Sequence, residues 1–240
     1  MKGKFVVVDG LGGAGKSTVL DKIEAFCKDG GLDYVRTREP GGTFAAEYLR
    51  KLCREGIPGD PDKLEPITQA LLFNAARAEN VQKVILPALR AGKVVLCDRF
   101  ADTTYAFQGG ALGVDLGVLQ GIHQLAHGIN PDMTFLLDGK PEVFLQRISP
   151  EEMASDQFDN LELTKLKNAR SMYLTMSTTY PEQYRVVDAM QSQEQVFAQI
   201  LPYLQELKNL MRQRPSTKGV QVIQDAFPGG SVSIKHTSEV

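Results

Sequence analysis

Between Val6 and Thr18 the chain reads Val-Val-Val-Asp-Gly-Leu-Gly-Gly-Ala-Gly-Lys-Ser-Thr. An apolar run that predicts a buried strand is followed by Gly-x-x-x-x-Gly-Lys-Ser, and the residues from Lys16 onward predict a helix. Glycines let the backbone curl so that consecutive N–H groups point at one anion, and the helix N-terminus adds partial positive charge. The sequence therefore predicts a phosphate-binding loop, against the alternative of a glycine-rich turn of accidental composition.

This loop is expected to hold the phosphates of a nucleoside triphosphate. Lys16 can reach the β- and γ-phosphates, and the Ser17 hydroxyl can ligate Mg²⁺. The residues predicted to bind the nucleotide are Gly10, Gly12, Gly13, Ala14, Gly15, Lys16, Ser17 and Thr18.

The composition is typical of a globular protein with one core. The 240 residues suffice for one α/β domain, and 42% hydrophobic and 23% charged residues are ordinary contents. The formal net charge of −2 gives no basic field, so nucleic acid is not expected as a main partner. No apolar run approaches the ~20 residues that span a membrane. The chain enters its first strand at once, so no signal peptide is expected.

The few cysteines and histidines indicate packing rather than chemistry. Cys27, Cys53 and Cys97 are widely spaced and odd in number, which favours buried thiols in a reducing cytoplasm over a disulfide framework or a metal cluster. His123 and His127 lie four residues apart on a predicted helix, without the acidic pattern of a zinc protease. We predict a packing or surface role for both histidines.

Short β-branched runs alternate with longer amphipathic segments, which predicts a parallel sheet covered by helices. The predicted strands are 4–9, 34–37, 94–98, 133–137 and 184–187. The predicted helices are 16–27, 43–53, 63–90, 116–127, 141–147, 161–178 and 193–212. Pro66 and Pro87 punctuate the third helix, so two helices or a proline near each end are both open. Gly92 closes it before the next strand.

The composition changes after residue 212, which divides the chain into a catalytic domain at 1–212 and a carboxyl-terminal extension at 213–240. Proline, glycine and serine cluster in the extension, and the apolar periodicity of the earlier helices fades there. An added hairpin and a loosely ordered tail are both consistent with this pattern.

Four further motifs follow the phosphate loop in a fixed order. They are Thr37-Arg38-Glu39-Pro40-Gly41-Gly42-Thr43, Leu71-Leu72-Phe73-Asn74-Ala75-Ala76-Arg77, Asp98-Arg99-Phe100 and Thr103-Thr104-Tyr105-Ala106-Phe107-Gln108-Gly109-Gly110. Together with the loop, this series resembles the thymidylate kinase family over roughly residues 4–205. The resemblance implies phosphorylation of dTMP to dTDP with ATP and Mg²⁺. It also implies the three-layer P-loop fold with a five-stranded parallel sheet, a short lid at 149–160, and a homodimer.

Three arginines fit the second anion site that a nucleoside monophosphate kinase needs. Arg38 and Arg99 lie at or beyond strand ends, where an open α/β sheet places its ligands, and Arg77 lies on the long helix. A guanidinium binds two oxygens of a phosphate monoester at once. Each arginine alone favours a structural ion pair, but their places in the motifs favour phosphate binding.

The resemblance assigns further residues to the acceptor pocket. The family's aromatic at the position of Phe73 stacks on the thymine ring, although a core position is the alternative reading of this residue. Thr104 and Gln108 match positions that line the base and sugar pocket. Phe107 replaces a family tyrosine beside the sugar 2′-carbon, and such an apolar wall disfavours an added hydroxyl by ~10²-fold.

Two acidic residues follow predicted strands. Asp98 ends the apolar run from Val94 and is placed to hold Mg²⁺ or its water, with helix capping as the alternative. Asp9 occupies a family glutamate position at the end of the first strand. We predict that Asp9 is a structural acid tied to the loop, with contact to the water shell of the metal ion as the alternative.

The sequence departs from the family at the loop and at the lid. Many family members carry an acid at the position of Gly12 that contacts the sugar hydroxyl, so its absence is expected to relax discrimination at the 3′-position. Relatives whose phosphate loop lacks an extra arginine usually carry several arginines in the lid. In this chain Gln157 occupies a lid position where an arginine is expected. The candidate replacement cations are Arg147, Lys165, Lys167 and Arg170, with Arg147 and Arg170 favoured as catalytic groups.

Three functions are open on these residues. The first is a dTMP kinase, with Lys16, Asp98 and Arg99 in the catalytic machinery. The second is a kinase of a related pyrimidine deoxynucleotide such as dUMP or a 5-substituted dUMP, which the base-pocket residues permit. The third is a nucleotide-binding regulatory protein that has lost catalysis, and the arginine-poor lid is its only support.

Overall fold

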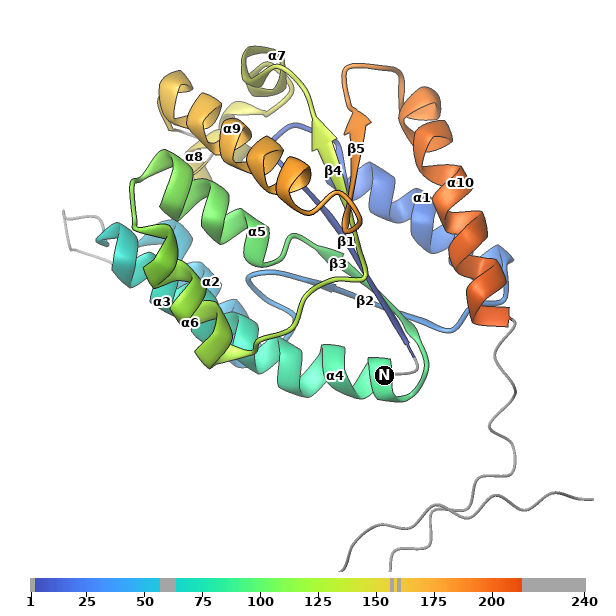
Figure 1. Ribbon diagram of the computed structural model, residues 1–240. Helices are drawn as coiled ribbons and strands as arrows, with labels where there is room; N and C mark the ends of the chain where they lie inside the picture. Colours follow the sequence, from blue (N-terminus) through green and yellow to red (C-terminus); the bar gives the residue numbers. More distant parts are fainter. Residues whose placement is uncertain (1–2, 57–63, 156–157, 159–160, 213–240) are drawn as a thin grey trace, which may run out of the picture.

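A five-stranded parallel sheet forms the centre of the computed structural model, which describes residues 3–56, 64–155, 158 and 161–212 (Figure 1). The strands are β1 (Lys4–Gly10), β2 (Tyr34–Arg38), β3 (Val94–Asp98), β4 (Met133–Asp138) and β5 (Tyr184–Asp188). Their order across the sheet is β2-β3-β1-β4-β5. The register places Val6 beside Leu96 on one side and beside Met133 on the other. All five strands were predicted within a residue of their observed ends.

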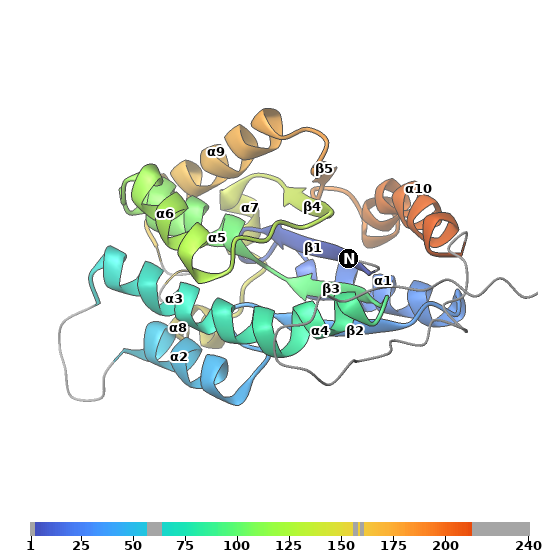
Figure 2. The same ribbon diagram turned by 60° about the horizontal axis from the view of Figure 1, so that its bottom comes forward.

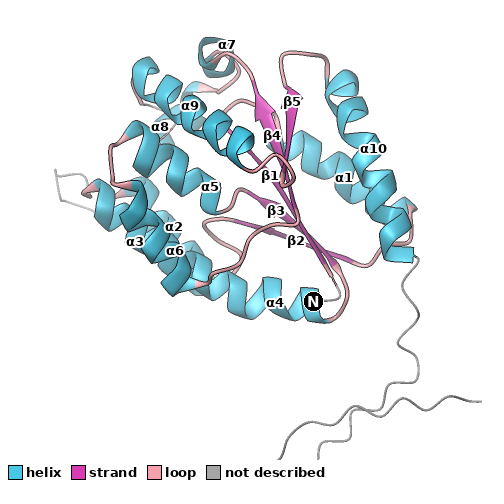
Figure 3. Cartoon of the chain, viewed as in Figure 1, coloured by secondary structure: helices cyan, strands magenta, loops and turns pink. Residues whose placement is uncertain are grey.

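The helices alternate with the strands along the chain (Figure 3). They are α1 (Lys16–Asp29), α2 (Phe44–Glu55), α3 (Pro66–Asn80), α4 (Leu86–Arg90), α5 (Ala101–Thr104), α6 (Leu116–Ala126), α7 (Pro141–Leu145), α8 (Pro150–Ser155), α9 (Leu163–Thr179) and α10 (Gln193–Arg212). Two π-helical segments, η1 (Val81–Ile85) and η2 (Tyr105–Ala111), continue α3 and α5. Among the described residues, no helix has the length and apolar character required to cross a membrane.

Both faces of the sheet are buried, which explains the continuous apolar run of β1. Side chains alternate between faces, so Val6 and Val8 pack with apolar residues of α1 and α10, while Phe5 and Val7 pack with η1 and α4. Helices α1 and α10 lie on one side of the sheet in Figure 1, and α4, α5 and α9 on the other. The predicted three-layer α/β fold is confirmed.

The predicted long helix at 63–90 is not a single regular helix. Residue 63 lies outside the described residues. Helix α3 begins at Pro66, and the missing N–H of proline costs nothing there, because the N–H groups of the first turn have no hydrogen-bond partner within the helix. Segment η1 separates α3 from α4, in which Pro87 again lies in the first turn. Gly92 follows with a φ of 80°, a left-handed conformation that suits glycine and ends the helix before β3.

Helix α2 packs on α3 rather than on the sheet (Figure 2). Its N-cap is Thr43, whose hydroxyl accepts a hydrogen bond from the Ala46 amide at 3.2 Å. The helix follows β2 through the Glu39–Gly42 turn, and it carries Arg54 in its last turn and Arg50 one turn earlier. This helix was predicted from the sequence at 43–53, but none of its side chains was expected to take part in the site.

Two helical segments were missed in the sequence. The α5–η2 stretch was read only as a motif, because its glycines and short apolar spacing do not show the 3.6-residue period of a helix. Helix α8 lies in the predicted lid at 149–160. Residues 156, 157, 159 and 160 of the lid, and with them the prediction for Gln157, lie outside the described residues, and so does the carboxyl-terminal extension at 213–240.

His123 and His127 have a packing role, as predicted. Their rings contact each other at a centroid distance of 4.3 Å, and the His127 ring also contacts Phe100 at 5.3 Å. Burial, reinforced by the positive charge of Arg77, lowers the pKa of His123 to about 4 and that of His127 to about 2. Both imidazoles are therefore neutral in the folded protein at neutral pH.

The free energy of unfolding should decrease as the pH falls below 6.5. The unfolded chain takes up protons on these histidines near pH 6.5, whereas the folded chain does not, so the folded state is disfavoured in acid. Between pH 7 and pH 5 each histidine accounts for a loss of about 2 kcal/mol. Urea unfolding at pH 5, 6, 7 and 8 measures this slope. In His127→Leu the slope of the unfolding free energy against pH should correspond to about one proton fewer taken up on unfolding. An unchanged slope would contradict the lowered pKa of His127.

Candidate active site

The phosphate loop connects β1 to α1 at the carboxyl end of the sheet. Gly13 has a φ of 72°, and a Cβ atom there would lie 2.2 Å from the Phe144 carbonyl oxygen, so only glycine fits. The Lys16 ammonium donates to the carbonyl oxygens of Leu11 at 2.7 Å and Gly10 at 3.2 Å. An open cavity of about 760 Å³ lies over the loop, and we call it the loop cavity. Its lining includes Gly12, Gly13, Ala14, Gly15, Lys16, Ser17, Thr18, Lys22, Asp98, Arg99 and Arg147.

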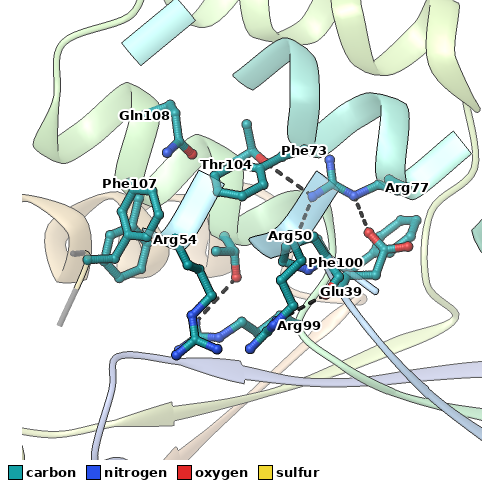
Figure 4. Close-up of a pocket in the computed structure, with 13 residues that line it drawn as sticks. Glu39, Arg50, Arg54, Phe73, Arg77, Arg99, Phe100, Thr104, Phe107 and Gln108 are labelled. Carbon is teal, nitrogen blue, oxygen red and sulfur yellow. Dashed lines mark hydrogen bonds and ion pairs between the residues drawn. The ribbon is translucent and has the colours of Figure 1, made fainter. Parts of the chain in front are cut away.

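A second cavity adjoins the loop cavity, and we call it the acceptor pocket (Figure 4). It is lined by aromatic rings, arginines and a few polar groups, the kind of lining that small-molecule sites have. The lining residues are Glu39, Pro40, Arg50, Arg54, Phe73, Arg77, Arg99, Phe100, Thr103, Thr104, Phe107, Gln108 and Phe158. The predicted residues Phe73, Arg77, Arg99, Thr104, Phe107 and Gln108 therefore lie together.

The Asp9 carboxylate is fully buried and ties the loop to the acceptor side. It accepts hydrogen bonds from the Gly10 amide at 2.8 Å, from the Thr103 hydroxyl at 2.9 Å and from the Tyr173 hydroxyl at 2.8 Å. Asp9 also lies 3.5 Å from the Arg99 guanidinium. These contacts agree with the structural role predicted for Asp9.

Arg99 has a φ of 65°, the single positive φ among the described residues other than glycine. A left-handed conformation costs a non-glycine residue on the order of 1–3 kcal/mol and persists only where the surroundings hold it. The Arg99 amide donates to the Val8 carbonyl at 3.0 Å, and its guanidinium donates to the Gly10 carbonyl at 2.8 Å. The strained backbone thereby directs this guanidinium to the boundary between the two cavities, both of which it lines.

Arg77 is fixed in place by a buried polar network. Its guanidinium forms an ion pair with Glu39 at 2.5 Å and donates to the Thr104 hydroxyl at 3.1 Å and the Asn74 side chain at 3.0 Å. Burial raises the pKa of Glu39 to about 7, although Arg77 and Asn80 favour its ionised form. Glu39 belongs to the Thr37–Thr43 motif but received no role from the sequence.

The remaining arginines predicted from the sequence lie in different environments. Arg147 lines the loop cavity, with its guanidinium over the Phe144 ring and 3.1 Å from the Ala189 carbonyl. Arg170 is held by Asp138 through two hydrogen bonds of 2.7 and 2.8 Å. Arg38 is exposed and paired with Glu47 at 2.8 Å, outside the linings of the two cavities.

The two lysines considered for the lid also lie away from the loop. Lys167 forms an ion pair with Glu142 at 2.7 Å, and Lys165 lines a separate hollow beside Leu161. Of the four candidate cations, Arg147 alone belongs to the lining of the loop cavity.

Several residues that line the acceptor pocket received no role from the sequence, among them Arg50, Arg54 and Phe158. Arg50 and Arg54 lie one turn apart on α2, and both also line the loop cavity. The (i, i+4) spacing that puts them on one face is visible in the sequence, but it is equally typical of a solvated helix surface. Phe158 contacts Phe73 at a centroid distance of 5.5 Å and Phe107 at 6.0 Å.

Of the buried side-chain oxygens that have no hydrogen-bond partner among the described residues, two line the cavities of the site. One is Oδ1 of Asp98, the last residue of β3, which lines the loop cavity. The other is the amide oxygen of Gln108, in the acceptor pocket. Because unpaired buried acceptors are costly, both positions suit a group supplied by a ligand or a metal ion.

A phosphate loop and an adjoining aromatic and arginine-lined pocket define a P-loop kinase with separate donor and acceptor sites. The chain belongs to the thymidylate kinase family, whose sequence profile matches residues 8–200. Membership of this family makes the chain a phosphotransferase that acts on dTMP.

Named relatives match most of the chain. The thymidylate kinase of Pelotomaculum thermopropionicum is 38% identical over 208 residues, covering 86% of this chain and 95% of the relative. That of Halalkalibacterium halodurans is 39% identical and covers 87% of this chain and 99% of the relative. The crystal structure of thymidylate kinase from Ehrlichia chaffeensis is 26% identical, with a TM-score of 0.68, and covers 85% of this chain and 99% of that chain.

Arg147→Ala should lower kcat on the order of tenfold, because Arg147 lines the loop cavity and a hydrogen bond to a charged group contributes ~1.5–3 kcal/mol. Arg170→Ala should lower it less, because Arg170 is paired with Asp138 outside that lining. Steady-state kinetics with saturating substrates, together with melting temperatures, compare the two variants. If both variants keep near-full turnover, neither arginine is the cation that replaces the missing lid arginines.

Proposed function

We propose that the chain transfers the γ-phosphoryl group of ATP to dTMP and releases dTDP and ADP. The observation that carries this proposal is the adjoining of the two cavities at Arg50, Arg54 and Arg99, which line both. A donor phosphate on the loop and an acceptor phosphate in the pocket would meet at this point. Positioning and charge stabilisation are the main contributions to phosphoryl transfer.

The donor site consists of the loop and its lysine. The loop amides bind the phosphates, and Lys16 leaves its two loop carbonyls to contact the β- and γ-phosphates. Ser17 and Asp98 fit a Mg²⁺ ion, because both line the loop cavity and the buried Asp98 Oδ1 has no partner among the described groups. When bound, the ion neutralises charge on the β- and γ-phosphates.

The acceptor site consists of the aromatic rings and the polar groups around them. Phe73 is placed to stack on the thymine ring, and the free amide oxygen of Gln108 can accept the N–H of a pyrimidine. Phe107 provides the apolar wall beside the sugar. Arg99 contacts the acceptor phosphate, while Arg77 orients the pocket through Glu39 and Thr104.

The role of Arg38 in substrate binding stays a proposal. Arg38 precedes Pro40, which lines the acceptor pocket, by two residues, and its guanidinium is paired with Glu47. Movement of Arg38 from Glu47 toward a bound phosphate would place it as the resemblance implies. Arg170, likewise, would have to leave Asp138 to reach the donor.

We also propose a homodimer in the cytoplasm. Ile67 and Leu71 on α3 and Val118 and Leu125 on α6 are exposed, and these two helices pack together. Such a group of apolar side chains suits a contact with a second copy. Cys27 and Cys97 are buried, as suits thiols of a reducing compartment.

Release of ADP with a panel of acceptors tests the proposed function. We expect turnover with dTMP, weaker turnover with dUMP, and an efficiency with 3′-deoxy-dTMP within tenfold of that with dTMP, because Gly12 offers no side chain to the 3′-hydroxyl. Lys16→Met should reduce kcat by at least about 10²-fold without changing the melting temperature. Preference for dUMP would assign the acceptor differently, and no turnover with any acceptor would leave a nucleotide-binding regulatory role.

A further inference from the structure

The lid of this chain holds no arginine in its described residues, yet a charged transition state has to be neutralised near the phosphate loop. The atoms transferred are defined by the proposed function, on which this inference rests. An oxygen of the dTMP phosphate bonds to the γ-phosphorus of ATP, and the bond from that phosphorus to the β–γ bridging oxygen breaks. The products are dTDP and ADP, and the total charge is unchanged. In between, negative charge spreads over the three equatorial oxygens of the phosphoryl group.

We propose that Arg54, on the last turn of α2, is a catalytic residue that binds the phosphoryl group in transit. Its side chain lines both the loop cavity and the acceptor pocket, so it lies where the two substrates meet. In Figure 4 the side chains of Arg50, Arg54 and Arg99 lie on the same side of the pocket, away from Arg77. A residue that bound the acceptor alone would line the acceptor pocket only, as Arg77 does.

The position of Arg54 on α2 follows from simple helical spacing. Arg50 and Arg54 are four residues apart and therefore on one face, above Cys53 and Ala46, which are buried. Arg50 is held in place by a hydrogen bond of 3.0 Å from its guanidinium to the Pro40 carbonyl. Arg54 is half-buried, so its charge is less screened by solvent than that of a surface arginine.

The other two arginines at this boundary are each tied to a backbone carbonyl. Arg99 donates to the Gly10 carbonyl and lies beside Asp9, which fixes it to the loop. Arg50 donates to the Pro40 carbonyl in the Glu39–Gly42 turn. Arg54 lies one turn further along α2, a helix that packs on α3, so α2 brings a second positive charge to the boundary that Arg99 reaches from the end of β3.

Steady-state kinetics of Arg54→Ala test the proposal. We expect kcat to fall by about 10²–10³-fold, because an arginine supplied to the transition state contributes on this scale, while KM for dTMP and for ATP each change less than about threefold. Arg54→Lys keeps the charge but loses the planar fork, so its kcat should be intermediate. The matched control is Lys51→Ala on the same helix, whose exposed side chain pairs only at 3.8 Å with Glu55 and should leave kcat unchanged.

A second measurement does not depend on turnover. Aluminium fluoride with ADP and dTMP mimics the phosphoryl group in flight, and the stability of this complex should fall in Arg54→Ala by the same factor as kcat. Binding of dTMP alone and of ADP alone should be unchanged, which also shows that the variant is folded. If Arg54→Ala does not fold, Arg54→Lys and Arg54→Gln give the same comparison.

Two results would overturn the proposal. Unchanged kcat and unchanged stability of the aluminium fluoride complex would exclude Arg54 from the transition state. A rise in KM for dTMP with unchanged kcat would make Arg54 an anchor of the acceptor phosphate instead. A wild-type chain without turnover on any acceptor would overturn the proposed function and this inference with it, whereas an active wild-type chain with an unaffected Arg54→Ala variant would overturn the inference alone.

Discussion

The buried carboxylate of Asp9 is the group on which the geometry of the site depends. A fully buried charge is tolerated only when its oxygens are hydrogen-bonded and a positive charge lies close. Asp9 meets both conditions through the Gly10 amide, the Thr103 and Tyr173 hydroxyls and the Arg99 guanidinium. These partners belong to the phosphate loop, to the two segments that follow β3, and to α9. One carboxylate thus fixes the donor loop and the acceptor side in a single frame.

The arrangement of positive charge follows from that frame. Asp9 and the Gly10 carbonyl hold Arg99 in a strained backbone conformation, and Glu39 holds Arg77 in the wall of the acceptor pocket. Both arginines are immobilised before a substrate arrives, which avoids the entropy cost of ordering them during the reaction. Arg54 reaches the boundary of the two cavities from a helix outside the sheet. The chain therefore supplies cations from α2, α3 and the residue that follows β3 to a site whose described lid residues supply none.

The sequence predicts the fold well and the charge arrangement only in part. The central strands β1, β3 and β4 are short apolar runs buried on both faces, which makes them easy to locate, and the half-exposed edge strands β2 and β5 were located as well. The phosphate loop was equally clear, because its glycines have a backbone role that no other residue can fill. By contrast, η2 was missed because Gly109 and Gly110 obscure helical periodicity. Arg54 looked like an ordinary surface residue of an amphipathic helix, since only the packing of α2 on α3 brings it to the site.

Ion-pair partners were the least predictable part of the site. Nothing in the spacing of Arg38 indicates that Glu47 holds it away from the pocket, or that Asp138 holds Arg170. Such pairs form between side chains far apart in the chain or on neighbouring turns, and many alternatives are available to each arginine. Glu39 was overlooked for a related reason. Its partners Arg77 and Asn80 come from a helix nearly forty residues further along, and its burial is a consequence of the completed fold.

If the loop cavity and the acceptor pocket form a single site that holds both substrates in line, a compound that joins adenosine and thymidine through a chain of five phosphates should fill both cavities at once. In isothermal titration we predict one molecule bound per chain, with a Kd at least about 10²-fold below those of ATP and dTMP, since the second half binds as an intramolecular event. A Kd no lower than that of ATP alone, or two molecules bound per chain, would contradict the account.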